Sequence, residues 1–525
     1  MGSAVSSFVL RGVLWFLWLL RRLFSIDGRT YAVMHLSQVQ WFLARVGRMG
    51  AQAAYYKAVQ SCPAYQDFLS KMGHKQNRRW RLEALPEMTK DNYVRKYSIE
   101  QRCYGGAIPK AGVVIDESSG STGMPNNWVR SAAERADVKR ILQLNYQLIY
   151  RDSGCILLNC FALGPWATGM NISMSLVEMG ILKSIGPDQK KLENTLELFG
   201  PAYHYLIFGY PPFIRAFVDE TRLDLSKYQF DLIVGGEGLS EGLRTHLQKS
   251  ARSVISSYGA SDLEINIAVE TELTIALRRL CLQNESLCKE LFDRETPPMI
   301  FQYNPLDYTI ETNSNHELLF TIGRQSGAAP KIRYNLRDSG GVFSLGALSR
   351  VLKKHSLPLS TLAARHSFLP LLFVYGRNDA TVPFYGAKIY PADLERIINE
   401  DPILAEQVHS FQLKAIEDDH LRSKLQVHLE LSKKGRDDLE IDQLQGMIFS
   451  GLIRVNQDFR EVSKMFDRSQ VEVFLYAYET GPFAGRDIRI KNKYIARLEP
   501  GSSVGKPSHL AQQGHKGCQG RKERL

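Results

Sequence analysis

Short apolar runs alternate with longer amphipathic stretches through residues 113–374 of this chain. Strand-length apolar runs lie at residues 155–161, 205–208, 232–234 and 253–256. Such runs, separated by helical stretches, predict α/β layers with mostly parallel sheets. The segments 317–322 and 341–345 predict further short strands, whereas the mixed apolar and polar stretches of residues 29–110 predict mainly helices.

The pattern changes after Gly376. Three further strands are predicted around one helix-rich stretch, in the order 409–416, 425–431, helix-rich 437–465 and 471–478. A mixed block of about 120 residues is long enough to form a separate small domain. We therefore expect four parts: an apolar N-terminal segment (1–28), a large domain (29–375), a small α+β domain (376–500) and a basic tail (501–525).

Composition and charge narrow the classes of protein and partner. With 525 residues the chain is too long for one compact core, and 44% hydrophobic residues are ordinary for a globular protein. The net charge of +11 favours anionic partners, which include nucleic acid, an acidic membrane surface and a phosphorylated ligand such as ATP or coenzyme A. No stripe of alternating basic and aromatic residues is visible, so we do not expect nucleic-acid binding. The seven cysteines form no CxxC pair, which argues against a zinc site and suits reduced thiols in the cytoplasm.

Residues 8–24 form the most apolar stretch of the chain, FVLRGVLWFLWLLRRLF. Its uninterrupted apolar core, residues 12–20, is much shorter than the roughly 20 residues that span a bilayer. No small-residue cleavage site follows, so a removable signal peptide fits poorly. Two interpretations remain: a helix lying in the membrane interface, with arginines and tryptophans at headgroup depth, or a helix docked on the protein's own surface or on a second subunit of a homodimer.

Residues 118–126 read SSGSTGMPN and follow an apolar run. Glycines allow backbone N–H groups to approach an anion closely, and hydroxyls add donors for phosphate oxygens. The segment is therefore a candidate phosphate loop, although a Ser/Gly-rich surface linker has the same composition. It is not a Walker loop, because the GxxxxGK[ST] spacing is absent. The candidate ligands of phosphate are Ser118, Ser119, Gly120, Ser121, Thr122 and Gly123.

Further segments follow in a fixed order: VGGEGLSEGLR at 234–244, SYGASD at 257–262, RYNLRD at 333–338, GRND at 376–379 and GAKIYPADLE at 386–395. Upstream, CPAYQ (62–66) and LPEMTK (85–90) open the series. From about residue 40 to about residue 500, this ordered set resembles the adenylate-forming (acyl-CoA synthetase) superfamily, and within it the phenylacetate–CoA ligase-like branch. The resemblance implies the adenylate-forming enzyme fold, with a large α/β domain and a small mobile lid.

The resemblance also implies roles for individual residues. In the predicted site, the adenine wall is formed by Gly235, Gly236 and Glu237, and the base stacks on Tyr258 beside Gly259. The ribose hydroxyls bind Asp338, and Arg377 makes a second contact with ribose or phosphate. Magnesium binds Asp262. Each has a plainer alternative: a tight turn for the glycines, a core position for Tyr258, a helix cap for Asp262 and a salt bridge with Arg333 or Arg337 for Asp338.

Three features depart from the family pattern or are ambiguous. The phosphate loop lacks the common lysine, and Arg130 would replace it unless it simply begins a solvated helix. The catalytic lysine near the end of the small domain is assigned to Lys491 in GRDIRIKNK (485–493), with Lys493 and Arg486 as alternatives. Asp379 occupies the hinge position. The acyl pocket is expected around residues 160–169, with His204 and Tyr210 as further candidates or as ordinary packing.

The reaction implied by the resemblance has two steps. A carboxylic acid of aryl or fatty type is activated by ATP and Mg²⁺ as an acyl-AMP with release of pyrophosphate, and a thiol, coenzyme A, then takes the acyl group. Transfer to an amine or a carrier protein is a variant of this scheme. The missing loop lysine and Asp262 in place of glutamate also allow a catalytically degenerate, membrane-attached nucleotide-binding scaffold.

Overall fold

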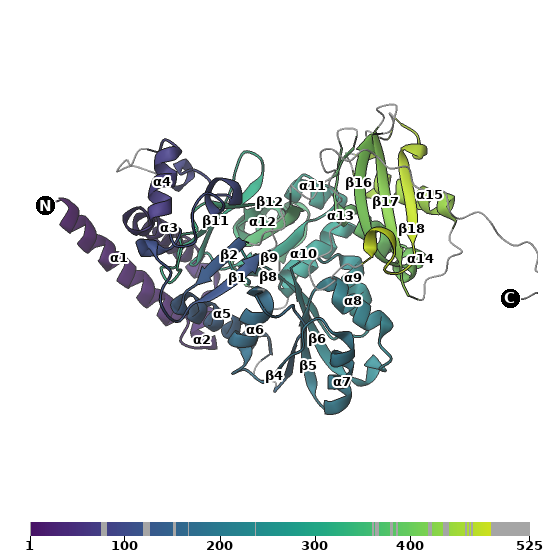
Figure 1. Cartoon of the computed structure of the whole chain (residues 1–525), viewed down its shortest axis with the longest axis horizontal. Coiled ribbons are helices and arrows are strands. Elements are labelled where there is room, and N and C mark those ends of the chain that lie inside the picture. The colour runs from purple at the N-terminus through teal and green to yellow at the C-terminus, as the bar shows by residue number, and fades with distance from the viewer. Residues whose placement is uncertain are drawn as a thin grey trace, which may run out of the picture.

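The structure is a computed structural model. It describes residues 2–74, 81–118, 126–150, 154–165, 167–236, 238–359, 362, 367–377, 382–384, 387–417, 423–433, 440–456, 459–460, 463 and 466–484. Figure 1 shows two lobes, a large one at the left and centre and a smaller one, in green and yellow, at the right.

One mixed sheet of eleven strands organises the large lobe, in the order β10-β11-β12-β13-β9-β8-β7-β6-β5-β3-β4. Five neighbouring strands are parallel: β4 (Ile181–Ser184), β3 (Ile156–Asn159), β5 (His204–Gly209), β6 (Gln229–Gly235) and β7 (Val254–Tyr258). The others pair antiparallel: β8 (Ala268–Val269), β9 (Met299–Tyr303), β13 (Leu371–Arg377), β12 (Tyr334–Phe343), β11 (Glu317–Ile322) and β10 (Tyr308–Thr312). The predicted α/β class is thus confirmed, with the parallel order confined to one half of the sheet.

The parallel half is covered on both faces because its strands are apolar at successive positions. Side chains alternate between the faces of a strand. Ile156 and Leu158 of β3 accordingly join one buried cluster, and Leu157 joins another. The first cluster packs against α7 (Gln189–Phe199), α8 (Pro211–Glu220) and α9 (Glu241–Leu247), and the second against α5 (Ala132–Tyr150) and α6 (Ala167–Leu176).

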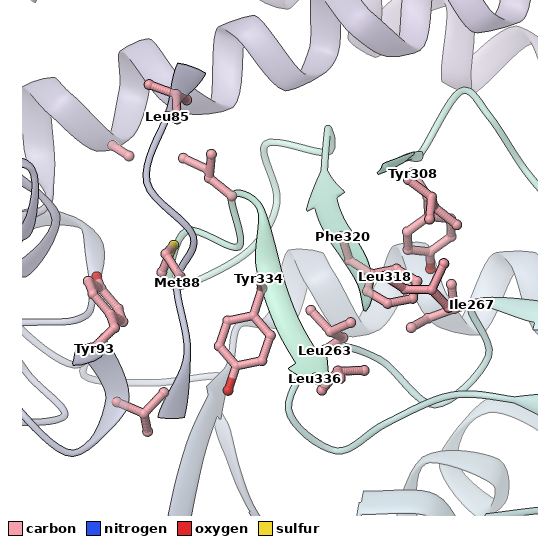
Figure 2. Close-up of a cluster of buried hydrophobic side chains, with 14 of the residues drawn as sticks. Leu85, Met88, Tyr93, Leu263, Ile267, Tyr308, Leu318, Phe320, Tyr334 and Leu336 are labelled. Carbon is pink, nitrogen blue, oxygen red and sulfur yellow. The ribbon is translucent and has the colours of Figure 1, made fainter. Parts of the chain in front are cut away.

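The antiparallel half has its own buried clusters. One lies between strands β9 and β13 and the helices α10 (Glu272–Gln283), α11 (Glu285–Phe292) and α12 (Leu345–Lys354). A larger one, shown in Figure 2, gathers Tyr334, Phe320 and Leu318 from the strands with Met88 and Tyr93 from the upstream segment. Helices α3 (Gln40–Ser61) and α4 (Pro63–Lys71) pack on this cluster, so the predicted helical character of residues 29–110 is confirmed there.

Helix α1 (Gly2–Phe24) lies along the outside of the large lobe, ahead of α2 (Gly28–Val33) (Figure 1). Its inner face is docked on the protein itself: Leu17 is fully buried, and the Arg21 guanidinium Nε lies 3.0 Å from a carboxylate oxygen of Asp307. Among the helices of the described residues, none is both long and apolar enough to cross a membrane.

Strands β1 (Val114–Ser118) and β2 (Asn126–Arg130) form a separate two-stranded antiparallel sheet. Because phosphate loops of parallel sheets lie at the carboxyl ends of strands, the apolar run before Ser118 predicts a strand of the main sheet that ends at Ser118. That prediction is wrong, because β1 pairs with β2 and, among the strands that the structure describes, has no partner in the eleven-stranded sheet.

The small lobe has a core of its own, which begins at Val382. Its elements are β14 (Val382–Phe384), β15 (Ala387–Ile389), α13 (Pro391–Glu400), α14 (Pro402–Gln407), β16 (Val408–Glu417), β17 (Ser423–Leu431), α15 (Ile441–Val455) and β18 (Val471–Tyr476). The predicted strands and the helix between them therefore exist. Gly376, the predicted boundary, lies in β13 with φ of +122°, a backbone conformation open to glycine and strained for other residues.

Polar contacts join the two lobes. Arg215 of α8 donates to the Asn399 side chain and to the carbonyl of Ala405. Farther along the interface, the Arg460 guanidinium forms two hydrogen bonds, of 3.1 and 2.9 Å, with the Glu295 carboxylate. The small lobe is thus held against α8 and against the segment that follows α11.

Candidate active site

Two of the predicted nucleotide-binding segments are neighbours at one edge of the sheet. Strand β6 ends at Gly235, which pairs with Ser257 in the adjacent parallel strand β7, and β7 ends at Tyr258. Ligands of open α/β sheets bind outside the carboxyl ends of the strands. The turns at 235–236 and 259–262 therefore share the position where a ligand is expected.

The backbone requires glycine at both turns. Gly236 has φ of +82°, and a Cβ there would lie 2.8 Å from a ring carbon of Tyr210. A Cβ on Gly259 would lie 2.2 Å from the carbonyl oxygen of Ile265. Since real Cβ atoms do not come within 3.0 Å of such atoms, both glycines are needed for close packing, and Gly236 is also needed for its positive φ.

Asp338 is joined to this edge by a side-chain contact. The hydroxyl of Tyr258 donates a hydrogen bond to the Asp338 carboxylate, and Asp338 is 7% exposed. Across β12 and β13, Asp338 stands opposite Arg377. The segments 257–262, 333–338 and 376–377 are thus brought together although they are far apart in sequence.

The Tyr258 ring packs inside the protein. It is stacked on Phe320 with a centroid distance of 6.1 Å and tilted against Phe301 at 5.7 Å. The structure therefore gives Tyr258 a role in holding Asp338. Its stacking on adenine stays a prediction.

A cavity of about 160 Å³ opens beside the two glycine turns. Its polar wall contains Gly235, Gly236, Gly259, Asp262 and Lys90. Polar side chains of Asn145, Thr168, Ser257, Ser261 and Asn266 also line it. Most of the remaining lining is apolar or aromatic and includes Leu142, Tyr146, Ile149, Tyr150, Phe161, Ile172, Leu176, Phe208, Tyr210, Ile233 and Ile265. The site thus combines a polar, glycine-rich wall with an apolar chamber.

The predicted acyl-pocket residues fall into two groups. Phe161, Ala167 and Thr168 line the cavity, and so does Tyr210. His204 lies elsewhere: its Nε2 is 2.7 Å from a carboxylate oxygen of Asp231, and its Nδ1 is 3.1 Å from the Cys155 sulfur. Within the described residues, His204 therefore belongs to a buried polar cluster at the opposite ends of the strands.

Sequence reasoning missed the wall that α5 contributes. Leu142, Tyr146, Ile149 and Tyr150 recur at helical spacing and face the cavity. That spacing, three or four residues apart, was the available signal. It predicts a buried face but does not say whether the face meets a core or a chamber.

Asp262, the candidate magnesium ligand, already has partners. One of its carboxylate oxygens lies 3.1 Å from the Lys90 ammonium group and accepts a hydrogen bond of 3.0 Å from the Tyr334 hydroxyl. In the described part of the chain, no group of three or more His, Cys, Asp or Glu side chains could hold a metal ion. These residues do not fit a resident metal site, so a magnesium ion here would have to arrive with its own phosphate ligands.

Arg130 overturns both expectations stated for it. It ends β2 and is buried, with Nε 3.0 Å from a carboxylate oxygen of Asp116 and one terminal nitrogen 3.1 Å from Glu134. The guanidinium also donates to the carbonyls of Ser261 and Leu263. Arg130 therefore neither begins a solvated helix nor is free to bind phosphate; it fixes the β1–β2 hairpin to the 259–264 segment.

Lys331 is a second basic side chain near this network, and it is half-buried. Its Nζ lies 3.7 Å from the centre of the Trp128 ring. Burial, reinforced by the charge of Arg130, holds the pKa of Lys331 well below its ordinary value, although Asp262 opposes the shift. Sequence reasoning did not select this lysine, because nothing local marks it as half-buried.

Several predicted residues lie outside the described residues: Ser119, Gly120, Ser121, Thr122, Gly123, Glu237, Asp379 and Lys491. For Ser118 and Arg377 the structure describes the backbone, in β1 and β13. Their roles stay predictions.

Comparisons with known proteins come from structure alone. No protein-family model and no curated protein sequence matches this chain. A 2-hydroxyisobutyryl-CoA ligase in the postadenylation state, in complex with R3-HIB-AMP, is 14% identical, with a TM-score of 0.60 over 88% of this chain and 90% of that one. The same ligase in complex with 2-HIB-AMP is 13% identical, again with a TM-score of 0.60 and the same coverage.

The likeness extends over both lobes. At these identities it establishes the fold, and the chain has the fold of the adenylate-forming enzymes, as the sequence motifs predicted. The phenylacetate–CoA ligase-like branch stays a prediction.

Proposed function

We propose that this protein is an ATP-dependent ligase that activates a carboxylic acid as an acyl-AMP and then transfers the acyl group to a thiol, coenzyme A. In the first step a carboxylate oxygen bonds to the α-phosphorus of ATP and pyrophosphate leaves. In the second, the thiolate bonds to the acyl carbon and AMP leaves. The observation that carries the proposal is the cavity in which the predicted adenine turn and the 259–262 turn adjoin an apolar chamber.

The ribose would bind at Asp338. A carboxylate can accept hydrogen bonds from two vicinal hydroxyls, and Tyr258 holds this carboxylate from the side of the glycine turns. Burial of Asp338 excludes water that would compete for it. Gly235 and Gly236 would then contact adenine through their backbone.

The phosphates would bind the loop between β1 and β2. The amide of Glu117, next to Ser118, donates a 2.8 Å hydrogen bond to the carbonyl of Pro165, two residues before Ala167 of the cavity wall. At its other end, the hairpin is held by Arg130 to Ser261 and Leu263. The Glu117 contact supports a phosphate loop that starts beside the cavity wall, and Arg130 fixes the end of the hairpin away from that loop.

The acid would occupy the chamber. A cavity of about 150 Å³ lined by apolar side chains holds benzene, and this one has about 160 Å³ and aromatic walls. The volume favours an aryl acid or a short aliphatic acid over a long unbranched fatty acid. The Lys90 ammonium group, at the polar wall, is placed where a carboxylate would approach.

The later steps rest on the resemblance. Lys491 would stabilise the charge that develops as the carboxylate attacks, and Asp379 would act as the hinge on which the small lobe moves before thiol transfer. Two ligase structures similar to this chain contain an acyl-AMP, and a third, in an open conformation at a TM-score of 0.50, contains 2-HIB-AMP and CoA. Magnesium would enter as the counter-ion of ATP, with Asp262 as its candidate neighbour, and no step is assigned to it.

One observation favours a second function. The ion pair of Asp262 with Lys90 neutralises the carboxylate expected at the metal, as a non-catalytic nucleotide-binding scaffold would tolerate. Transfer to an amine or a carrier protein instead of coenzyme A is the other alternative.

Pyrophosphate release from ATP separates these functions. It should be measured with a panel of aryl and short aliphatic acids, with Mg²⁺ and coenzyme A present. We expect acid-dependent release that falls by at least about tenfold in Asp338→Asn, which loses a charge-assisted hydrogen bond worth about 1.5–3 kcal/mol. Asp224→Asn, the same change at a surface turn ahead of β6, is the matched control. ATP binding without release for any acid would favour the scaffold, and no ATP binding would refute both.

A further inference from the structure

The outward face of helix α1 exposes large apolar side chains. Trp15 is 63% exposed, Trp18 54% and Leu23 48%, whereas Leu17 on the inner face is fully buried. A helix that is apolar all round is normally covered on every side. Within the described part of the chain, only one side of α1 is covered, so the other presents an apolar surface to an external partner.

The exposed face is held in a fixed orientation. Arg21 pairs with Asp307 and donates a 2.9 Å hydrogen bond to the carbonyl of Leu306. Just after the helix, the Arg140 guanidinium donates to the carbonyl of Ser25 at 2.6 Å. Figure 1 shows α1, in purple, at the outer edge of the molecule, with its N-terminal end pointing away from the body.

The charge on this segment has one sign. The first acidic residue of the chain is Asp27, and before it come Arg11, Arg21 and Arg22. The Arg22 guanidinium lies 5.5 Å from the Trp18 ring centre, so the exposed ring and the exposed cation form a pair. Tryptophan with arginine is the combination that suits the boundary between acyl chains and phosphate headgroups.

We propose that the outward face of α1 binds a membrane surface that carries anionic headgroups. Trp15, Trp18 and Leu23 enter the interface, and Arg22 contacts headgroup phosphate. The helix lies in the plane of the membrane, because its inner face stays docked through Leu17 and Arg21. This proposal is independent of the ligase activity.

A second copy of the chain would cover the face less well. A symmetric contact places the same patch on both partners. Two α1 faces would then form a contact in which residues 1–26 of both copies contribute arginines and no carboxylate to offset their charge. Anionic lipid supplies the opposite charge, and the attraction between its headgroups and these arginines weakens as ionic strength rises.

Vesicle co-sedimentation of the full chain tests the proposal. The probe is a set of vesicles of phosphatidylcholine alone and of an equal mixture with phosphatidylglycerol, at low and high salt. We expect binding to the mixed vesicles that weakens at high salt and falls by about tenfold or more in the double variant Trp15→Glu/Trp18→Glu. Leu198→Glu, which changes a side chain 72% exposed on α7, is the matched control and should bind as the wild type does.

Three results would overturn the proposal: no binding to mixed vesicles, unchanged binding of the double variant, or equal loss in Leu198→Glu. Sedimentation velocity in the absence of lipid tests whether a second copy of the chain binds this face instead. A dimer that the double variant abolishes would assign the face to a second copy, whereas a monomer at all concentrations supports the membrane. Because the exposed tryptophans are outside the core, both variants should keep the wild-type melting temperature, which confirms that they fold.

Discussion

The hydroxyl of Tyr258 donates a hydrogen bond to the carboxylate of Asp338, 80 positions later in the chain. Three strands, β8, β9 and β13, separate β7 from β12 in the sheet order. In a flat sheet, four strand spacings amount to about 19 Å, much farther than a tyrosine side chain reaches. The sheet must therefore curl between these strands, and the curl places the predicted ribose ligand beside the glycine turns.

Tyr258→Phe tests whether this contact positions Asp338. The change removes the hydroxyl and keeps the ring that packs on Phe301 and Phe320. We expect the KM for ATP to rise about 3- to 10-fold with little change in kcat, because one hydrogen bond to a charged group is lost. Tyr205→Phe, which removes a buried hydroxyl bonded to the Gly200 carbonyl, is the control. A KM as in the wild type would show that Asp338 needs no help from Tyr258.

The chamber should decide which acid is used. Ile265→Ala enlarges it next to Gly259, so the ratio of kcat/KM for a bulkier to a smaller aryl acid should rise by about tenfold. Ile310→Ala, the same change in the buried cluster of the antiparallel strands, should cost stability and leave the ratio unchanged. Equal ratios in all three proteins would place the acid outside this chamber.

Arg130 should matter for folding. Arg130→Ala leaves the buried carboxylates of Asp116 and Glu134 without their cation, at a cost of about 3–5 kcal/mol in the free energy of unfolding. Arg468→Ala breaks an exposed ion pair with Asp442 and should cost at most about 1 kcal/mol. Urea denaturation measures both values. Similar midpoints for the two variants would contradict the buried network.

The stability of the small lobe should depend on pH through Asp393. Burial raises the pKa of Asp393 to about 6, against the opposing hydrogen bonds from the Tyr390 amide and the Asn456 side chain. Between its ordinary value of 3.8 and about 6, the folded state keeps a proton that the unfolded chain releases. This contribution to stability is therefore fully present below about pH 4 and is lost as the pH rises through 6.

Asp393→Asn removes this titration. The melting temperature of the wild type relative to Asp393→Asn should fall from pH 4 to pH 6 and stay constant above that. Thermal unfolding of both proteins across the range measures the difference. A difference that does not vary with pH would show that Asp393 titrates alike in the folded and unfolded states.

Many strands and turns of the eleven-stranded sheet could be predicted because their signals are local. A continuous apolar run predicted a strand at residues 317–322, and the structure has β11 at Glu317–Ile322. The strand predicted at residues 341–345 is correct only as far as Phe343, because Ser344 caps α12 and Leu345 is the first residue of that helix. The glycines at 235, 236 and 259 were selected by motif, and the structure shows why a side chain would not fit there.

The predictions that were wrong concern residues whose partners are distant in sequence. Arg130 was taken for a surface or phosphate-binding residue because Asp116, Ser261 and Leu263 meet it only in the folded chain. The hairpin of β1 and β2 was missed for a similar reason, since an apolar run does not reveal which strand it pairs with. The chamber wall of α5 looks like any buried helix face.

The central claim is that the glycine turns, Asp338 and the apolar chamber bind one acyl-adenylate. The most direct measurement is a crystal structure of the protein with a stable acyl-sulfamoyl adenosine that carries a benzoyl group. The account predicts ribose hydroxyls within hydrogen-bond distance of the Asp338 carboxylate, adenine against Gly235 and Gly236, and the benzoyl ring among Tyr146, Phe208 and Ile265. An analogue bound elsewhere, or a ribose out of reach of Asp338, would contradict it.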